Sequence, residues 1–298
     1  MPKLTIGLPI YDGGDLVPER LDSILSQTFS DFELLITVDP SPDNSVQICE
    51  DFAKKDNRIR LVKQNKKMGW MWSFDFLIQN ANTEYFTLVA VDDIWTSNFL
   101  ENIINEFEKN KKNLVCVFPK INRYGGFLEF QIDTNDSILT KFYKKFRQRF
   151  RPFLSCSLEG SIEKNVTISL RNQSYGFLVG IMKTDIIKKS SCYDKPFFVC
   201  DWGFALNILK YGNAIQVDDA SIKVGTDGIS SKGIFSLWKN QPVKWNEYFL
   251  PYSTFSIWVI KNFGLKIFLK NLDYFIWLNF TGVVAIIHDL LRITKIVK

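Results

Sequence analysis

The chain is poor in a residue type that several common active sites require. Its 298 residues include a single histidine, His288, which argues against a Ser-His-Asp triad and against a metal site built from histidines. His288 lies in an apolar segment near the C-terminus. This position predicts an interfacial or packed imidazole rather than a catalytic one.

Cysteine usage is equally restrictive. The chain has five cysteines, an odd number, and no CxxC pair occurs. A disulfide framework or a cysteine-rich zinc site is therefore disfavoured, and a reducing compartment fits the composition. The five residues are Cys49, Cys116, Cys156, Cys192 and Cys200.

Two glycine-rich nucleotide-binding signatures are also missing. No GxGxxG occurs, and neither GxxxxGKS nor GxxxxGKT occurs, so a dinucleotide-type Rossmann site and a P-loop are both disfavoured. The first residues, MPKLTIGLPIYDGG, alternate like a strand and lack a small-residue cleavage site. They do not resemble a secretory signal, and we expect a cytoplasmic protein.

A long hydrophobic run is absent from a C-terminal segment that is otherwise rich in aromatics. Its longest uncharged stretch, residues 274–288, is 15 residues long, short of the roughly 20 that a spanning helix needs. Residues 232–298 carry nine basic and three acidic residues. We therefore expect residues 231–298 to form an amphipathic extension that lies on the cytoplasmic face of a membrane. The alternative is that this segment packs on the rest of the chain.

Hydrophobic periodicity alternates between strand and helix over the first 120 residues. The predicted strands are residues 4–10, 33–39, 59–64, 85–91 and 114–119, and the predicted helices are residues 21–29, 44–55, 71–81 and 98–110. This order predicts an α/β domain on a mostly parallel sheet flanked by helices. Ligands of such sheets bind beyond the carboxyl ends of the strands, where Tyr11, Asp39, Asp92 and Asp93 fall.

The periodic pattern is lost between residues 122 and 174. Within that stretch, residues 141–151 read KFYKKFRQRFR and carry six basic side chains. They predict either a solvated helix face or a surface for anionic lipid or a pyrophosphate-bearing acceptor. Further on, residues 202–211 read as a helix closed by Gly212, after an apolar run at residues 196–199 that predicts a strand.

Asp92 and Asp93 form the most informative pair of side chains. Adjacent carboxylates at the end of a strand repel each other, and a bound cation removes that repulsion. Oxygen ligands suit Mg²⁺ or Mn²⁺, which bridge to phosphates and neutralise a departing diphosphate. Taken alone, the pair is equally consistent with capping of the next helix.

Five short segments between residues 9 and 93 carry a family resemblance. They are Pro9-Ile-Tyr11-Asp12, Ser26-Gln27-Thr28 with Glu33, Val38-Asp39 with Ser41 and Asp43, Asn65 with Gly69, and Val91-Asp92-Asp93. In order and spacing they closely resemble the patterns PxYN, SQTxxxxE, VDDGSxD, NxxxG and DADD of family 2 glycosyltransferases. The resemblance covers residues 3–120, and a looser match extends to about residue 230.

The resemblance implies a nucleotide-sugar site. Pro9 and Tyr11 would line the base pocket, Asp39 would accept a hydrogen bond from a pyrimidine N–H, and Gly69 belongs to the same site. Asp92 would contact the ribose or the sugar phosphate. Asp93 would be the ligand of Mg²⁺ or Mn²⁺.

The same family requires a general base before a helix in its acceptor half. The Glu-Asp pair of the family corresponds here to Cys200-Asp201, so the resemblance implies that Asp201 takes the proton of the acceptor hydroxyl. The alternative is that Asp201 only caps the following helix. Asp194 is the second candidate for the base.

Together these features predict a GT-A-like fold and transfer of a sugar with inversion. Residues 1–230 would form the catalytic domain, with residues 1–120 binding a UDP- or dTDP-sugar and residues 121–230 binding the acceptor. The acceptor would be a glycan or lipid-linked glycan in surface polysaccharide synthesis, and no nucleic acid is expected. A sugar-phosphate nucleotidyltransferase stays an alternative. So does a non-catalytic glycan-binding or scaffold relative, because Val38, Ala90 and Cys200 depart from the family's acidic residues.

Overall fold

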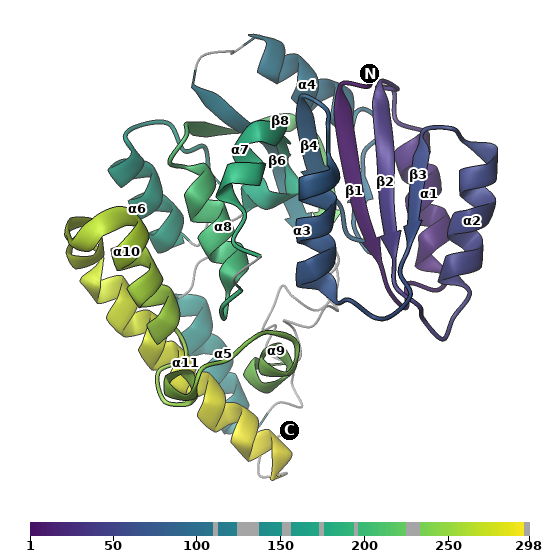
Figure 1. Cartoon of the computed structure of the whole chain (residues 1–298). Coiled ribbons are helices and arrows are strands. Elements are labelled where there is room, and N and C mark those ends of the chain that lie inside the picture. The colour runs from purple at the N-terminus through teal and green to yellow at the C-terminus, as the bar shows by residue number, and fades with distance from the viewer. Residues whose placement is uncertain are drawn as a thin grey trace.

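An eight-stranded mixed sheet forms the centre of the molecule (Figure 1). The computed structural model describes residues 1–109, 113–123, 137–150, 156–172, 176–193, 196–224 and 233–294. Within these residues the strand order is β3-β2-β1-β4-β7-β6-β8-β5. The predicted α/β architecture is confirmed.

The first half of the chain alternates strands and helices as the periodicity predicts. Its elements are β1 (Leu4–Ile10), α1 (Leu16–Leu25), β2 (Phe32–Val38), α2 (Ser45–Lys55), β3 (Ile59–Lys63), α3 (Trp70–Asn80), β4 (Tyr85–Leu88), β5 (Ile94–Trp95) and α4 (Phe99–Lys109). Strands β3, β2, β1 and β4 are parallel neighbours, with Ile10 opposite Val38. The loops that follow β1, β2 and β4 therefore leave the sheet at one edge.

The second half of the chain completes the sheet with strands of both directions. Its elements are β6 (Leu114–Arg123), α5 (Ile138–Phe150), α6 (Ile162–Asn172), η2 (Gly176–Val179), β7 (Ile181–Lys183), α7 (Thr184–Ser190), α8 (Cys200–Ile208) and β8 (Asn213–Val224). Strand β7 is antiparallel to both β4 and β6, whereas β6 and β8 are parallel. Gly180 is required before β7, because a Cβ there would lie 2.4 Å from the carbonyl oxygen of Val117.

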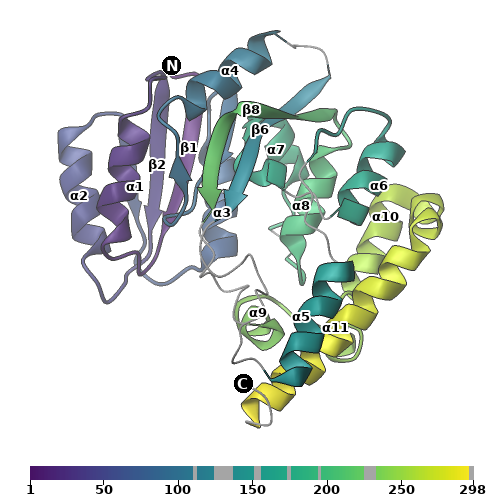
Figure 2. The same cartoon turned by 180° about the vertical axis from the view of Figure 1, so that it is seen from behind.

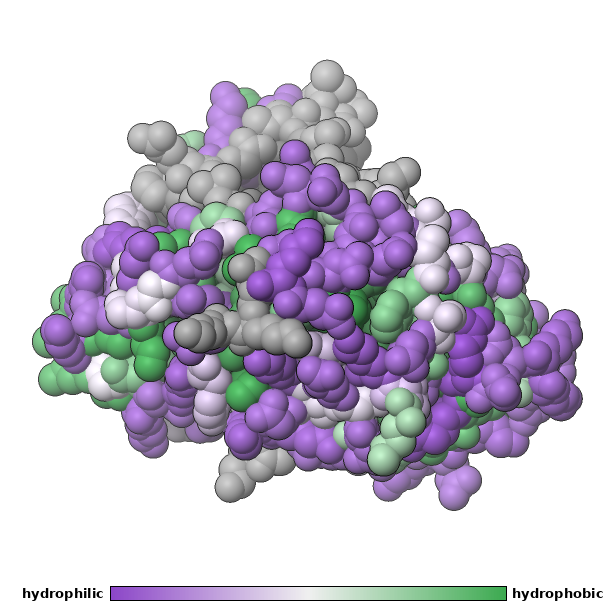
Figure 3. Space-filling view, turned by 90° about the horizontal axis from the view of Figure 1, so that it is seen from above, coloured by the Kyte–Doolittle hydropathy of each residue, from purple (hydrophilic) through white to green (hydrophobic). Residues whose placement is uncertain are grey.

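Helices cover both faces of the sheet. Helices α1, α2 and α4 lie on one face, and α3, α7 and α8 lie on the other, as comparison of Figure 1 with Figure 2 makes clear. Two hydrophobic cores result, one containing Val17, Cys49 and Phe99 and the other containing Leu77 and Phe204. Seen from above, the molecule is mainly hydrophilic, and hydrophobic residues gather toward one edge (Figure 3).

The C-terminal extension is helical, as predicted. It comprises α9 (Ile234–Asn240), η4 (Trp245–Tyr248), α10 (Ser253–Lys270) and α11 (Leu272–Ile293). Its buried residues Phe255 and Phe275 belong to the same core as Phe204 of α8, so one face of the extension packs on the rest of the chain. The domain boundary at residue 230, between the expected catalytic domain and the extension, stays a prediction.

Helix α11 is longer than the uncharged run within it. It has 22 residues and is the one helix in the described part of the chain that is long and apolar enough to cross a membrane, by length and composition alone. A third of its most apolar window is buried. The expectation that this segment is too short to span is therefore not supported by the helix length.

The stretch that lacks periodicity in the sequence contains two helices, α5 and α6, so the helix that is one interpretation of the basic segment is present. Helix α5 takes in most of the basic segment and lies beside α11 (Figures 1 and 2). His288 of α11 is buried, and its Nε2 lies 3.4 Å from Thr140 Oγ1 of α5. The expected packed imidazole is therefore confirmed. Arg151, the last residue of the basic segment 141–151, lies outside the described residues.

Candidate active site

The loop after β1 is bonded to the loop after β2. Asp43 Oδ2 accepts hydrogen bonds from the Gly14 amide and from Ser45 Oγ, both at 2.7 Å. Burial raises the pKa of Asp43, but hydrogen bonds from Ser41, Ser45 and Gly14 outweigh it and lower the pKa to about 2. The ionised carboxylate therefore joins the two loops at neutral pH, and its position in the VDDGSxD-like segment could have identified it as a site residue.

Asp39 joins the loop after β2 to the start of α3. Its carboxylate is 3% exposed, and Oδ2 accepts hydrogen bonds from the amides of Met68 at 2.9 Å and Gly69 at 3.0 Å. Its Oδ1 is buried without a hydrogen-bond partner among the described residues. Gly69 has φ 84 and ψ 160, a conformation that essentially only glycine adopts. The two predicted site residues Asp39 and Gly69 are thus in direct contact.

Tyr11 stands at the same sheet edge with 42% of its surface exposed. The Lys67 ammonium lies over the Tyr11 ring, 3.6 Å from its centre, which is a cation–π contact. Pro9 is half-buried two residues earlier and faces Thr37 across the sheet. Lys67 is a site residue that the sequence analysis missed, although it lies between the Asn65 and Gly69 of the matched pattern.

Asp92 and Asp93 follow β4 at the same edge. Asp93 is 4% exposed, and its Oδ2 accepts a hydrogen bond from the Ala90 amide at 3.2 Å. Asp92 is half-buried beside it. The preceding Val91 connects this loop to helix α1, because Arg20 Nε donates to the Val91 carbonyl at 3.4 Å. The predicted strand to residue 91 is wrong, since β4 ends at Leu88 and the chain turns to present both carboxylates.

The acidic pair fits a hard divalent ion. No cluster of three or more acidic, histidine or cysteine side chains that could hold a metal occurs within the described ranges. Mg²⁺ does not need such a cage, because one or two carboxylates suffice when substrate phosphates and water complete the coordination. Carboxylate oxygens are also the ligand type that Mn²⁺ accepts. Asp92 and Asp93 are therefore suitable for an ion shared with a diphosphate.

Asp201 lies in the first turn of α8. The strand predicted before it is wrong: residues 196–199 form a turn, and Val199 is left-handed, with φ 59. Burial raises the pKa of Asp201 to about 6, outweighing two backbone hydrogen bonds that lower it. The pKa of Asp201 therefore lies close to the value that a general base needs. Asp194 lies outside the described residues.

Contacts between α3 and α8 place the start of α8, which carries Asp201, beside the start of α3. The Cys200 thiol donates to Met71 Sδ at 3.8 Å, and Met71 is two residues after Gly69. The rings of Trp70 and Tyr193 meet edge to face, 6.0 Å apart. The negative charge of Asp201 further raises the pKa of Tyr193, after the larger effect of burial. One series of contacts thus runs from Asp39 through the start of α3 to Asp201.

Comparison of the sequence with known proteins agrees with this arrangement. The sequence pattern described as "Glycosyl transferase family 2" matches residues 5–161. Glycosyltransferase GlyG from Streptococcus pneumoniae is 33% identical over 112 residues, which are 38% of this chain and 37% of GlyG. The match therefore spans little more than a third of that relative.

Comparison of the structure extends the likeness over nearly the whole chain. The crystal structure of S. aureus TarS 1-349 in complex with UDP-GlcNAc has a TM-score of 0.54 and 14% identity, covering 95% of this chain and 81% of TarS 1-349. The mannosyltransferase PcManGT from Pyrobaculum calidifontis, in complex with GDP-Man and Mn²⁺, also has a TM-score of 0.54 and 14% identity. The matched region covers 98% of this chain and 88% of the PcManGT chain. The predicted GT-A-like fold is confirmed.

Proposed function

This chain belongs to glycosyl transferase family 2, and from that premise we propose that it transfers a sugar from a nucleoside diphosphate sugar to a hydroxyl group with inversion. The observation that carries the proposal is the series of contacts that links Asp39 to Asp201 through the Gly69–Met71 segment. A nucleotide-reading carboxylate and a carboxylate with a pKa of about 6 stand on one side of the sheet.

Each carboxylate has a separate task in the proposed reaction. Asp39 accepts a hydrogen bond from the base, and Tyr11 and Pro9 line the base. Asp93 would hold Mg²⁺ or Mn²⁺, an ion that would neutralise charge on the nucleoside diphosphate, and Asp92 would contact the ribose or the sugar phosphate. Asp201 removes the proton of the acceptor hydroxyl as its oxygen bonds to C1 of the sugar and the bond from C1 to the diphosphate breaks. One displacement by one nucleophile inverts the anomeric centre.

We propose a UDP- or dTDP-sugar as the donor. The bound UDP-GlcNAc of TarS supports a uridine nucleotide, whereas the GDP-Man of PcManGT is the competing precedent. Asp39 favours a base with an N–H beside its carbonyl groups, which uracil and thymine provide. Guanine also has such an N–H. Thermal denaturation in the presence of Mn²⁺ and a uridine, thymidine or guanosine nucleotide therefore ranks the three nucleotides by the stabilisation that each gives. A nucleotide that binds only the folded chain raises the melting temperature, and at equal concentration the tighter-binding nucleotide raises it more.

The proposed acceptor is a glycan or a lipid-linked glycan of surface polysaccharide synthesis, met at the cytoplasmic face of a membrane. Exposed apolar side chains on the C-terminal extension support that location. Trp245 is 77% exposed, Phe249 72%, Ile293 68% and Ile276 60%. Several large apolar side chains exposed on one segment indicate an interaction surface. A lipid carrier would be presented to the enzyme from that surface.

The metal assignment is tested with Asp93→Asn. We expect the variant to fold normally, because asparagine keeps the size of the side chain and an oxygen for the Ala90 amide. It should lose the part of UDP-sugar affinity that depends on Mn²⁺, since a neutral amide is a poor ligand for a hard cation. Calorimetric titration with and without Mn²⁺ measures this. Unchanged metal-dependent affinity would refute the role of Asp93.

A non-catalytic glycan-binding relative is the second candidate function. Cys200 favours it, because the thiol occupies the position of the family's glutamate and burial raises its pKa to about 12. A neutral thiol there cannot replace a carboxylate. Metal-dependent hydrolysis of the donor separates the two functions, because an enzyme releases the nucleoside diphosphate slowly to water and a scaffold does not.

A further inference from the structure

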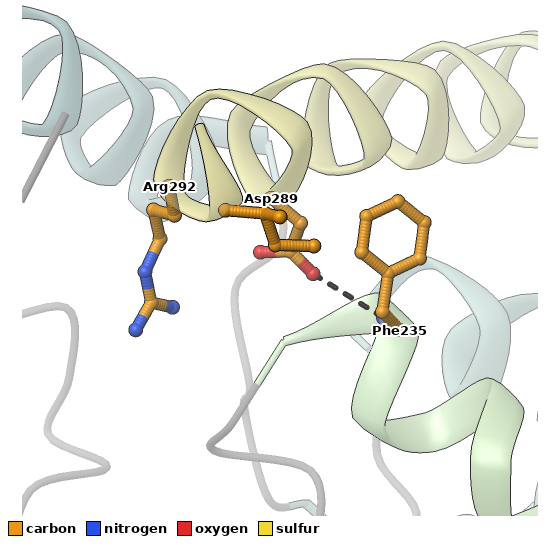
Figure 4. Close-up of a pocket in the computed structure, with 4 residues that line it drawn as sticks. Phe235, Asp289 and Arg292 are labelled. Atoms are coloured by element: carbon orange, nitrogen blue, oxygen red, sulfur yellow. Dashed lines mark hydrogen bonds between the residues drawn. The ribbon is translucent and has the colours of Figure 1, made fainter. Parts of the chain in front are cut away.

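Helix α9 is held at its start by the C-terminal helix α11. Asp289 Oδ2 of α11 accepts a hydrogen bond from the Phe235 amide at 3.3 Å, as Figure 4 shows. Gly233 precedes the helix with φ 96, and a Cβ there would lie 2.4 Å from the same carboxylate. Glycine therefore permits α11 to approach the start of α9 this closely.

The end of α9 lies between the start of α3, which follows Gly69, and the turn at Val199 that precedes α8. The Asn240 carbonyl accepts a hydrogen bond from Trp70 Nε1 at 3.3 Å, directly after Gly69. The next residue, Gln241, accepts a hydrogen bond through its side-chain Oε1 from the Val199 amide at 2.9 Å. Two successive residues thus contact both sides of the proposed reaction centre.

Val199 adopts a backbone conformation that its side chain disfavours. Its φ of 59 and ψ of 39 lie in the left-handed region, where a β-branched residue is a genuine outlier. Its carbonyl accepts a hydrogen bond from the Trp202 amide at 3.0 Å, and its side chain is 5% exposed. Strained residues of this kind persist where the surroundings over-determine them, and they cluster at functional sites.

We propose that Gln241 is a positioning residue for the transfer reaction. By accepting the Val199 amide, it holds the left-handed turn that sets the start of α8 and therefore the place of the Asp201 carboxylate. The neighbouring bond from Trp70 to Asn240 fixes the same segment relative to the nucleotide loop. This inference rests on the proposed function, in which Asp201 is the general base.

Gln241→Met tests the inference, because methionine keeps the length of the side chain and removes the acceptor oxygen. We expect kcat to fall about 10-fold to 100-fold, the scale of a small misplacement of a catalytic group, with the donor KM and the affinity for UDP unchanged. The acid limb of the kcat–pH profile should move to lower pH, because a relaxed loop lets water solvate Asp201. A parental kcat in this variant would overturn the proposal.

A second substitution tests the backbone role directly. Glycine adopts a positive φ without steric cost, so Val199→Gly added to Gln241→Met should restore kcat several-fold. A double variant no faster than Gln241→Met would also overturn the proposal. Lys239→Ala is the matched control, because Lys239 is an exposed residue of the same helix, and we expect parental kinetics.

Asp201→Asn, assayed in parallel, separates this inference from the proposed function. If Asp201→Asn transfers sugar at the parental rate, the assignment of the base fails. If Asp201→Asn is inactive and Gln241→Met is parental, the base assignment stands and only the positioning role fails.

Discussion

The two oxygens of the Asp39 carboxylate stand in different environments. Oδ2 accepts two amide hydrogen bonds, whereas Oδ1 is buried without a partner among the described residues. A buried acceptor without a donor is unfavourable by about 1–3 kcal/mol. A base N–H reaching Oδ1 would remove that cost, which is a physical reason for a nucleotide to bind here.

We therefore expect Asp39→Ala to weaken UDP binding by about 1–3 kcal/mol, the scale for a lost hydrogen bond to a charged group. The variant also leaves the Met68 and Gly69 amides without their acceptor, so its melting temperature should fall as well. Titration calorimetry with UDP alone measures the affinity. Asp51→Ala, on the exposed side of α2, is the control and should bind UDP as the parent does. Equal affinities of the two variants would mean that Asp39 does not contact the base.

Asp201→Asn should lower transfer by about 10²–10⁴-fold, the usual contribution of a general base, and leave the donor affinity unchanged. Because burial raises the pKa of Asp201 to about 6, only the ionised form present above that pH can accept a proton. Parental transfer should accordingly decline as the pH falls through about 6. Transfer rates and donor affinities measured on one preparation of Asp201→Asn test the role of Asp201 as general base. Transfer within a few-fold of the parental rate would mean that Asp201 only caps the helix.

The same raised pKa has a consequence for stability. The folded state holds the proton of Asp201 up to a higher pH than the unfolded chain, whose carboxyl ionises near the ordinary aspartate pKa of 3.8. Asp201 thus destabilises the fold increasingly as the pH rises from about 4 to 6, and the full effect persists above pH 6. Asp201→Asn should therefore raise the melting temperature at pH 8 and have little effect at pH 4. A lower melting temperature at pH 8 would indicate that capping dominates.

At the scale of elements, a glycine with an unusual backbone supports the nucleotide loop. Gly69 has φ 84 and ψ 160, and no atom lies within 4 Å of a Cβ built there. Gly69→Ala therefore tests backbone strain without a steric clash. We expect about 1–3 kcal/mol of destabilisation together with weaker UDP binding, because the shifted loop no longer presents both amides to Asp39.

The C-terminal extension offers a matched control. Gly264 interrupts α10 with φ 85 and ψ 159, and a Cβ there also meets no atom within 4 Å. Gly264→Ala should therefore lower the free energy of unfolding by a similar amount and leave UDP affinity intact. Denaturant unfolding and UDP titration of both variants provide the comparison. A similar loss of UDP affinity in both would mean that strain at residue 69 has no specific role.

Elements with strong local periodicity could be predicted from sequence, and elements defined by distant contacts could not. Strand β1 matches its prediction at both ends because nearly all of its residues are buried, which gives a continuous apolar run of strand length in the sequence. The apolar run at residues 196–199 is buried instead by α10: Phe197 stacks on Trp258, and Phe198 lies against Tyr252. Burial by a helix more than 50 residues away leaves no local period, so the run resembles a strand in the sequence.

The residues of the candidate site fall into the same two groups, those that could be predicted from the sequence and those that depend on distant contacts. Residues at strand ends, such as Asp39 and Asp93, could be placed because parallel strands deliver their ends to one edge. Lys67 and Gln241 act through contacts between separate segments, to the Tyr11 ring and to the Val199 amide. No spacing rule connects residues 199 and 241, so only the fold reveals that contact.

At the scale of the whole molecule, the charge of the C-terminal extension is partly neutralised by the rest of the chain. Lys266 and Lys270 of α10 both pair with Glu163 of α6 and are the neutralised basic residues, whereas the pair of Arg171 with Asp273 engages an acidic residue of the extension. These ion pairs lie where the extension packs on the catalytic part. The proposed membrane contact therefore depends more on apolar side chains than the sequence charge alone indicates.

Those apolar side chains belong to η4, the turn after it, and the outer face of α11. The segment between η4 and α10 lies across the middle of α11. The Tyr252 amide donates a hydrogen bond to Asn279 Oδ1 at 3.0 Å, and a Cβ on Gly282 would lie 2.9 Å from Pro251. Exposed Phe249 is therefore held close to the middle of α11, where Phe280 is 49% exposed. This arrangement suits insertion of aromatic side chains at the lipid–water boundary.

We expect the full chain to float with vesicles that contain anionic lipid. Because apolar contacts dominate, binding should survive moderate salt and should fall about 10-fold or more when Trp245 and Phe249 are both changed to serine, since each buried aromatic contributes about 1.5–3 kcal/mol. Tyr211→Ser is the control, because Tyr211 is also an exposed aromatic, 45% exposed, but lies outside the extension. Alkaline carbonate then distinguishes the two ways in which α11 could meet the bilayer: an in-plane helix is released, and a spanning helix is retained. Failure of the parent to float at low salt would mean that the extension serves only to pack on the catalytic part.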